Sequence, residues 1–330
     1  MLWIEKYRPA DFSGIIGQEP AVRSLSKFAH SGSVPHLILC GSHGTGKSVA
    51  VECFAKALYQ DNWELNTSVF QTADLFLQGK SFLEQDEKYI HLYQKNQSLL
   101  TNFKYILKWY ASLRPLDATF KLMVFEDAHA LSREAQQALR RIMERTSTTA
   151  RFIFTTTNQN AIIPAISSRC LPLFFAPVDR ELMSGYLRLL MAREKACQYF
   201  CSDDDLDLIV QASAGDMRRA ILLLQAALES GKCQDILTIT QSETANVASS
   251  AMTVLKGGDF RSAIRRLESL MIDYGLSGSD ILSEIRLITQ REYNHPAISI
   301  ALADTEFRMH HANNEFVQIG AFATRIQEIF

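Results

Sequence analysis

An eight-residue glycine-rich segment constrains the fold more than any other part of this chain. It reads Gly41, Ser42, His43, Gly44, Thr45, Gly46, Lys47 and Ser48. A short apolar run at 37–40 precedes it, and a helical pattern over 49–58 follows it. Glycines let successive backbone amides point inward, and the N-terminus of the next helix adds partial positive charge. This order predicts a phosphate-binding loop in which Lys47 reaches the outer phosphates and Ser48 ligates Mg²⁺.

The pattern around this loop alternates between strand and helix, which is typical of a parallel sheet covered on both faces. The binding site of such a sheet lies at the carboxyl ends of its strands. The first stretch, to about Gly17, is instead expected to be an extended arm that packs onto a domain. We expect further strands at 65–70, 121–125, 151–156 and 171–175, and helices over 19–29, 98–110 and 131–146.

Polar side chains follow two of the expected strands. Glu126 and Asp127 end the run 121–125, and Asn158 follows the run 151–156. Adjacent carboxylates at the end of a buried strand are costly unless a cation shares the site. We therefore expect these residues to join the phosphate loop in one site for nucleotide hydrolysis. The simpler alternatives are an exposed acidic turn and an ordinary turn asparagine.

Two arginines stand where helix or core formation does not require them. Arg169 lies in an otherwise apolar region, either as an arginine at the core edge or as a finger that reaches a neighbour's nucleotide. Arg218 and Arg219 begin a predicted helix over 217–230, where the helix dipole disfavours a cation. That placement favours a functional charge.

Composition limits the partners and the compartment. The chain of 330 residues suggests two or three domains, and its formal net charge is −2. A protein that wraps nucleic acid alone is usually basic, so any such contact needs a local patch or a surface pooled with other subunits. No apolar run suits a membrane span, and the N-terminus lacks signal-peptide features. Six scattered cysteines favour free thiols over zinc or disulfides.

Beyond Pro177 the pattern predicts helices alone. They are expected at 203–212, 217–230, 260–274, after Asp280, and at 313–330. The last of these predict a separate bundle, whose apolar stripes form either a core or a subunit interface.

Six motifs occur in a recognisable order. They are residues 3–9 (WIEKYRP), 16–19 (IGQE), the phosphate loop, 135–144 (AQQALRRIME), 168–170 (SRC) and 215–220 (GDMRRA). Together they resemble the small subunits of replication factor C, the sliding-clamp loader of archaea and eukaryotes, with the archaeal form nearest. The resemblance covers nearly the whole chain. It implies an α/β P-loop AAA+ ATPase domain at 1–176, a small helical lid at 177–240 and an all-α collar at 241–330 that joins subunits into a ring.

The resemblance also implies roles for individual residues. ATP with Mg²⁺ would be the bound cofactor, with the metal held by Ser48 and Glu126. Asn158 would be the first sensor and Arg218 the second, while Arg169 would act in trans on the adjacent subunit's ATP. The adenine would be bordered by Tyr7, Arg8, Pro9 and Ile16.

The chain departs from the family pattern in two places. The family has Asp-Glu-Ala-Asp at the strand end, whereas this chain has Glu126-Asp127-Ala128-His129, so the base carboxylate is one methylene shorter. A misplacement of about 1 Å costs on the order of a hundredfold in rate. The family's Ser-Asp-Glu-Arg-Gly segment, which carries DNA contacts, is replaced here by residues 72–97. The candidates for DNA contact are then Lys80, Lys95, Lys104 and Lys108, although Lys104 and Lys108 also fit a solvated helix face.

The first functional hypothesis is an ATP-dependent clamp-loader subunit. With large and small replication factor C subunits it would help to open a PCNA-type clamp and load it onto primer–template DNA. The alternative is a scaffold subunit that binds ATP without hydrolysing it and donates Arg169 to its neighbour. A third hypothesis is a stand-alone AAA+ remodeller. The expected location is the archaeal cytoplasm, at the nucleoid, with the nucleus as the alternative and no membrane partner.

Overall fold

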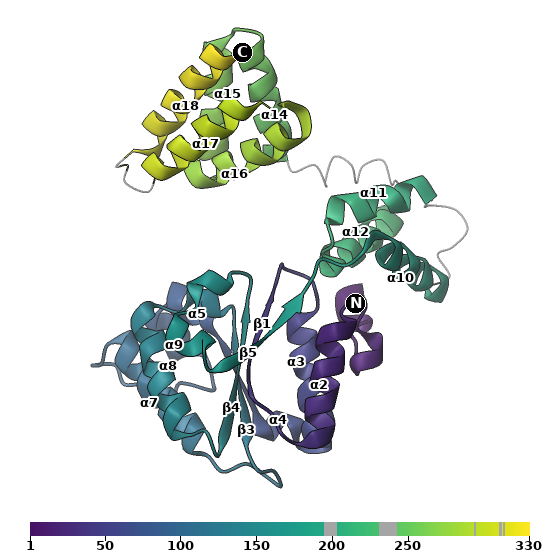
Figure 1. Ribbon diagram of the computed structural model, residues 1–330, viewed down its shortest axis with the longest axis vertical. Coiled ribbons are helices and arrows are strands. Elements are labelled where there is room, and N and C mark those ends of the chain that lie inside the picture. The colour runs from purple at the N-terminus through teal and green to yellow at the C-terminus, as the bar shows by residue number, and fades with distance from the viewer. Residues whose placement is uncertain (195–202, 231–242, 294, 310–311, 313) are drawn as a thin grey trace. The chain divides into compact units, whose positions relative to one another are not determined.

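The structure is a computed structural model that describes residues 1–194, 203–230, 243–293, 295–309, 312 and 314–330. The chain forms two compact units, Met1–Gly231 and Lys232–Phe330 (Figure 1). The expected division at 176 between an ATPase domain and a lid stays a prediction. The expected boundary at 240 lies outside the described residues.

The first unit is built on a parallel sheet of five strands in the order β2-β3-β4-β1-β5. Strand β1 therefore has a partner on each side, with Leu39 opposite Thr155 on one neighbour and Leu173 on the other. The predicted parallel sheet is confirmed. Its strands are β1 (His36–Gly41), β2 (Thr67–Gln71), β3 (Lys121–Glu126), β4 (Ala150–Thr156) and β5 (Cys170–Phe175).

Helices cover both faces of this sheet (Figure 1). One face packs against α2 (Glu19–Ser31), α3 (Lys47–Tyr59) and α4 (Trp63–Asn66). The other packs against α5 (Thr72–Leu77), α6 (Lys80–Gln85), α7 (Leu99–Ser112), α8 (Arg133–Arg145) and α9 (Pro164–Ser167). Two core clusters result, and the strands between them are apolar at successive positions because both of their faces are buried.

Strand β1 illustrates how one apolar run serves both cores. Leu37 and Leu39 belong to the cluster under α2 and α3, while Ile38 and Cys40 belong to the cluster under α7 and α8. All four side chains are buried because successive residues of a strand point to opposite faces. The phosphate loop begins at the carboxyl end of this buried strand, which fixes the position of the loop.

The N-terminal arm differs from the extended conformation that we expected. It contains a helical turn, α1 (Trp3–Lys6), and a 3-10 turn, η1 (Phe12–Gly14). Asp11 caps the second turn, because its Oδ1 accepts a hydrogen bond from the Ser13 amide at 2.8 Å. Neither turn contains a buried residue. Hydrogen bonds within the arm, rather than burial, therefore stabilise the second turn.

The first unit ends with α10 (Arg180–Arg193), α11 (Asp203–Ser213) and α12 (Met217–Ser230). The sequence predicted α11 and α12 but missed α10. Two signals mark this helix. Asp179 accepts from the Glu181 amide at 2.9 Å as an N-cap, and Met183, Leu187 and Leu190 are buried at helical spacing.

The second unit is helical in all its described residues except short connections. Its elements are α14 (Glu243–Lys256), α15 (Phe260–Ile272), α16 (Gly278–Ile288), the π-turn η5 (Thr289–Tyr293), α17 (Pro296–Met309) and α18 (Glu315–Ile329). They enclose one core that includes Leu267, Ile285 and Phe322. The predicted helices that correspond to α15, α16 and α18 are confirmed, whereas α14 and α17 were not predicted.

Cys40, Cys53 and Cys170 are buried free thiols, in line with the prediction, and burial raises the pKa of each. The remaining cysteines, Cys197, Cys201 and Cys233, lie outside the described residues. In the part of the chain that the structure describes, no helix is both long and apolar enough to cross a membrane.

Candidate nucleotide-binding site

The phosphate loop joins β1 to α3, as the sequence predicted. Gly44 (φ 65°) and Gly46 (φ 96°) adopt left-handed backbone conformations that favour glycine. The Thr45 hydroxyl donates to the Ser42 carbonyl at 2.9 Å and closes the loop. Ser48 lies in the first turn of α3, and a helix N-terminus favours an anion.

Lys47 is buried beneath this loop. Its Nζ donates to the carbonyls of Gly41 (2.8 Å) and Ser42 (2.6 Å). Burial lowers the pKa of Lys47, as does the nearby positive charge of Arg218, while the charges of Asp127 and Asp216 raise it. Charges from the end of β3 and from the start of α12 therefore act on one lysine.

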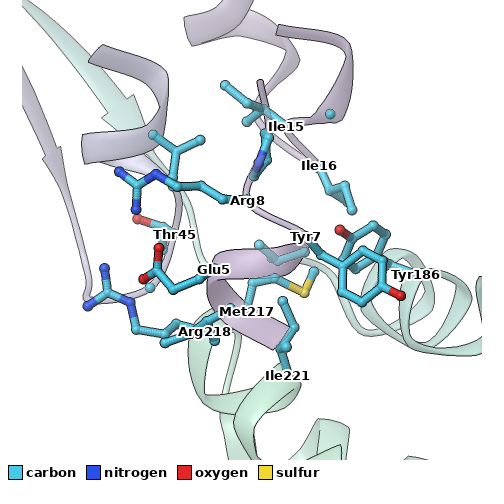
Figure 2. Close-up of a pocket in the computed structure, with 17 residues that line it drawn as sticks. Glu5, Tyr7, Arg8, Ile15, Ile16, Thr45, Tyr186, Met217, Arg218 and Ile221 are labelled. Carbon is cyan, nitrogen blue, oxygen red and sulfur yellow. The ribbon is translucent and has the colours of Figure 1, made fainter. Parts of the chain in front are cut away.

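A cavity of about 380 Å³ opens beside the loop. Three segments supply most of its lining, and Val49, Val178 and Tyr186 complete it (Figure 2). The loop supplies Gly44, Thr45 and Gly46; the arm supplies Tyr7, Arg8, Pro9 and Ile16 among others; and α12 supplies Met217, Arg218 and Ile221. Each of the four residues that the resemblance assigned to adenine thus lines the same cavity as the phosphate loop.

The charged and aromatic side chains of the cavity separate into two ends. Figure 2 shows Glu5, Thr45 and Arg218 together, while Tyr7 and Tyr186 lie away from them. Sequence reasoning missed Glu5 and Tyr186 as lining residues. Tyr186 lies on α10, the helix that was not predicted, so the N-cap and the apolar spacing of that helix are the signals that would have pointed to it.

Side-chain hydrogen bonds attach the arm to three helices of the first unit, α3, α10 and α12. The Trp3 amide donates to Oε1 of Gln225 on α12 at 2.8 Å. Lys6 Nζ and Tyr7 Oη both donate to Glu194, at the C-terminal end of α10. Arg8 contacts Glu52 on α3 through its Nε (2.9 Å). The arm therefore connects α10 and α12 with the helix that follows the phosphate loop.

The start of α12 also contacts the loop directly. The Met217 amide donates to the Gly44 carbonyl at 3.2 Å. Asp216 caps α12 by accepting from the Arg219 amide at 2.9 Å, and its side chain lies against the Cα of Gly44. A Cβ on Gly44 would stand 1.6 Å from Asp216 Oδ1. Only glycine allows this approach.

The two acids at the end of β3 interact with different neighbours. Glu126 Oε2 accepts from Gln71 Nε2, on the adjacent strand β2, at 2.7 Å. Asp127 has a left-handed backbone (φ 50°), and its charge acts on Lys47. The Thr72 hydroxyl donates to the backbone carbonyls of both Glu126 and Asp127 and so stabilises the turn between them. Asp127 is therefore the acid whose field reaches the phosphate loop.

Magnesium fits this arrangement only together with phosphates. Hydroxyl and carboxylate oxygens, as on Ser48, Glu126 and Asp127, are ligands that Mg²⁺ prefers. Among the described residues there is no cluster of three or more acidic, histidine or cysteine side chains that would hold a metal alone. Mg²⁺ in nucleotide sites usually takes one or two protein ligands and completes its shell with phosphates and water.

Asn158 and Arg169 do not line the cavity in this structure. Asn158 is exposed at the end of β4, and its Oδ1 accepts from the Asn160 amide at 3.0 Å as the cap of η4 (Gln159–Ala161). Arg169 precedes β5 and bonds Glu144 of its own chain, with 2.8 Å between Nη2 and Oε1. Their roles as sensor and finger stay predictions.

A second cavity, of about 790 Å³, lies between α7 and α8. It is lined by Lys104 and Lys108 from α7 and by Arg141 and Arg145 from α8, with Glu134 as an acid. The sequence named the two lysines but missed the two arginines. The candidates Lys80 and Lys95 do not line this cavity, and Lys80 Nζ donates to the Lys95 carbonyl at 3.4 Å.

Two family models match the chain. Residues 17–179 match the model described as DNA polymerase III, delta subunit. Residues 239–325 match the model described as replication factor C C-terminal domain. The first match lies within the first compact unit and the second match lies within the second.

Solved structures resemble this fold at low sequence identity. A RuvB variant from Thermotoga maritima gives a TM-score of 0.56 at 17% identity, covering 84% of this chain and 88% of its own. The Orc1 protein of Aeropyrum pernix, solved in complex with DNA, gives 0.53 at 17% identity, covering 82% and 83%. These similarities support the predicted AAA+ fold.

Full-length relatives extend the comparison to the whole chain. A replication factor C small subunit from Picrophilus torridus is 35% identical, covering 99% of this chain and 98% of the relative. The corresponding subunits from Thermoplasma volcanium (31%; 99% and 98% covered) and Methanococcus maripaludis (32%; 98% and 98% covered) are also similar. With the phosphate loop, the arm and α12 gathered around one cavity, the chain belongs to the family of archaeal replication factor C small subunits.

Proposed function

We propose that this chain is an ATP-dependent clamp-loader subunit in DNA replication. Within a hetero-oligomeric ring of large and small replication factor C subunits, it helps to open a PCNA-type sliding clamp and to load it onto primer–template DNA. The observation that carries the proposal is the shared cavity of the phosphate loop, the arm and Arg218 in a member of this family. Family membership gives the stand-alone remodeller no support.

ATP binding divides among the three segments that supply most of the cavity lining. The loop amides and Lys47 hold the phosphates, while the arm residues border the adenine. Ser48 and a strand-end carboxylate hold Mg²⁺, which supplies positive charge to the phosphates when it is bound. Arg218, at the start of α12, reports the terminal phosphate to the lid.

Hydrolysis requires a base for the attacking water. We assign this role to Asp127, because its charge acts on Lys47 while Glu126 bonds Gln71. The water oxygen attacks the γ-phosphorus, the bond to the bridging oxygen of ADP breaks, and Asp127 takes the water's proton. Asn158 orients the water, and Arg169 of the adjacent subunit stabilises the charge on the phosphoryl group.

Removal of the Asp127 carboxylate tests this assignment against the scaffold alternative. In a loader whose other phosphate loops are disabled, Asp127→Ala is expected to lower clamp- and DNA-stimulated ATP turnover by about 10²- to 10³-fold, because the general base is lost. ATP binding, measured in parallel by titration, is expected to change little.

The exchanged pair Glu126→Asp with Asp127→Glu is the complementary variant. If it raises turnover while Asp127→Ala leaves the rate unchanged, the subunit is a nucleotide-binding scaffold that does not hydrolyse ATP. Loss of the rate in Asp127→Ala alone supports a working site with the shorter base.

DNA binding is proposed for the cavity between α7 and α8. Its four cations, Lys104, Lys108, Arg141 and Arg145, form a local basic patch in a chain whose net charge is −2. Such a patch supplies phosphate contacts without sequence specificity, and neighbouring subunits add to it.

Salt dependence measures the number of those contacts. Lys104→Ala with Lys108→Ala is expected to weaken primer–template binding by the loader and to reduce the slope of log affinity against log salt by about 1–2. Fluorescence anisotropy at several salt concentrations, with a slowly hydrolysed ATP analogue, gives the slope. Lys27→Ala is the control. If Lys80→Ala with Lys95→Ala reduces the slope instead, the contact lies on the 72–97 segment.

A further inference from the structure

The guanidinium of Arg169 is held by three acceptors of its own chain. Nη1 donates to the Ala165 carbonyl at 2.7 Å and to Ser168 Oγ at 3.4 Å. Nη2 donates to Glu144 Oε1 at 2.8 Å. These bonds use three of the five guanidinium N–H groups. The Nε–H and one Nη2–H can still donate to a phosphate of a neighbouring subunit. The side chain of Arg169 is 40% exposed and so stays accessible to a neighbour.

Glu144 stands at a position that helix stability does not favour. It lies in the last turn of α8, where the helix dipole disfavours an anion. Its ion pair with Arg169 is 42% exposed on the glutamate side, and exposed ion pairs contribute little to folding. The same Oε1 lies 3.5 Å from Arg140 Nε, so one carboxylate oxygen separates two cations that would otherwise repel.

We infer that Glu144 is a positioning residue for Arg169, and this inference rests on the proposed role of Arg169 as a finger in trans. An arginine side chain loses much rotamer freedom when it binds one phosphate in one geometry. Acceptors at both Nη atoms fix the plane of the guanidinium before the neighbour's ATP arrives. Glu144 also offsets the charge of Arg140, which would otherwise push Arg169 away.

A double-mutant cycle in the assembled loader tests the inference. Only the adjacent subunit, whose ATP Arg169 would contact, keeps a working phosphate loop. Glu144→Ala is expected to lower kcat at that site about three- to tenfold with little change in KM, because the finger must be ordered in the transition state. Arg169→Ala is expected to lower it further, and the double variant is expected to match Arg169→Ala.

A matched control breaks a similar exposed pair elsewhere in the first unit. Arg188 Nη2 lies 2.9 Å from Asp203 Oδ1, and Asp203→Ala is expected to leave kcat and KM unchanged. Glu144→Gln keeps an acceptor without the charge, and its rate is expected between those of wild type and Glu144→Ala. If Glu144→Ala does not assemble, as judged by size exclusion, the same cycle with Glu144→Gln decides the question.

The outcomes separate the inference from the proposal beneath it. If Arg169→Ala leaves the adjacent site unaffected, the finger assignment itself is wrong. If Arg169→Ala slows that site but Glu144→Ala does not, or raises the rate, only the positioning role is wrong. The positioning role is also wrong if Glu144→Ala slows the adjacent site equally in the presence and absence of Arg169, because the glutamate would then act independently of the finger.

Discussion

ATP turnover at this subunit's own site is expected to fall by at least about a hundredfold when Lys47 is replaced by methionine. The lysine is buried at the base of the phosphate loop, where its Nζ bonds the Gly41 and Ser42 carbonyls. Phosphates that enter the loop offer Nζ stronger, charged acceptors than these carbonyls. Methionine has a similar length but supplies neither the charge nor the donors. Steady-state hydrolysis and ATP titration of the assembled loader measure the loss.

Folding is not expected to explain that loss. Burial lowers the pKa of Lys47, so the folded protein already disfavours its charged form, and an apolar side chain of similar length fits the same space. The unfolding temperature of Lys47→Met without ATP is therefore expected near that of wild type. Lys27→Met, on the exposed side of α2, is the control and should retain full turnover. Full turnover by Lys47→Met would show that the loop does not hold the hydrolysed nucleotide.

Gly44→Ala is expected to weaken ATP binding by about a hundredfold, since it displaces loop and lid together. A Cβ at this position would stand 1.6 Å from Asp216 Oδ1, and the left-handed backbone (φ 65°) adds about 1–2 kcal/mol of strain for alanine. Asp216 caps α12, and the Met217 amide bonds the Gly44 carbonyl, so the clash moves the helix that carries Arg218. Titration with fluorescent ATP measures the affinity.

Gly32→Ala separates backbone strain from the clash. Gly32 has the same φ of 65°, but an added Cβ would meet nothing within 4 Å. This variant is expected to lose about 1–2 kcal/mol of folding free energy and no ATP affinity. If the two variants bind ATP equally well, the contact between Gly44 and Asp216 has no part in nucleotide binding.

Much of this protein follows from short stretches of sequence. The phosphate loop is local, because its glycines, its lysine and the flanking strand and helix lie within about twenty residues. The strands were predictable because burial on both faces leaves uninterrupted apolar runs, as in β1 and β3. The arm and α12 could be assigned to the nucleotide through family motifs, and both line the cavity. The spacing of apolar residues did not predict α17, because its apolar residues are spread around the helix instead of forming one stripe.

Tertiary structure alone decided the directions of the functional side chains. Glu126 and Asp127 are neighbours in sequence, yet strand pairing places Gln71 beside the first, and a left-handed turn brings the charge of the second to bear on Lys47. Glu144 and Arg169 are 25 residues apart and meet because α8 packs against α9, which ends two residues before Arg169. Contacts between residues remote in sequence depend on packing, which local propensity does not encode. Local sequence therefore predicts a phosphate-binding loop, and the packing of distant elements sets which side chains lie beside that loop.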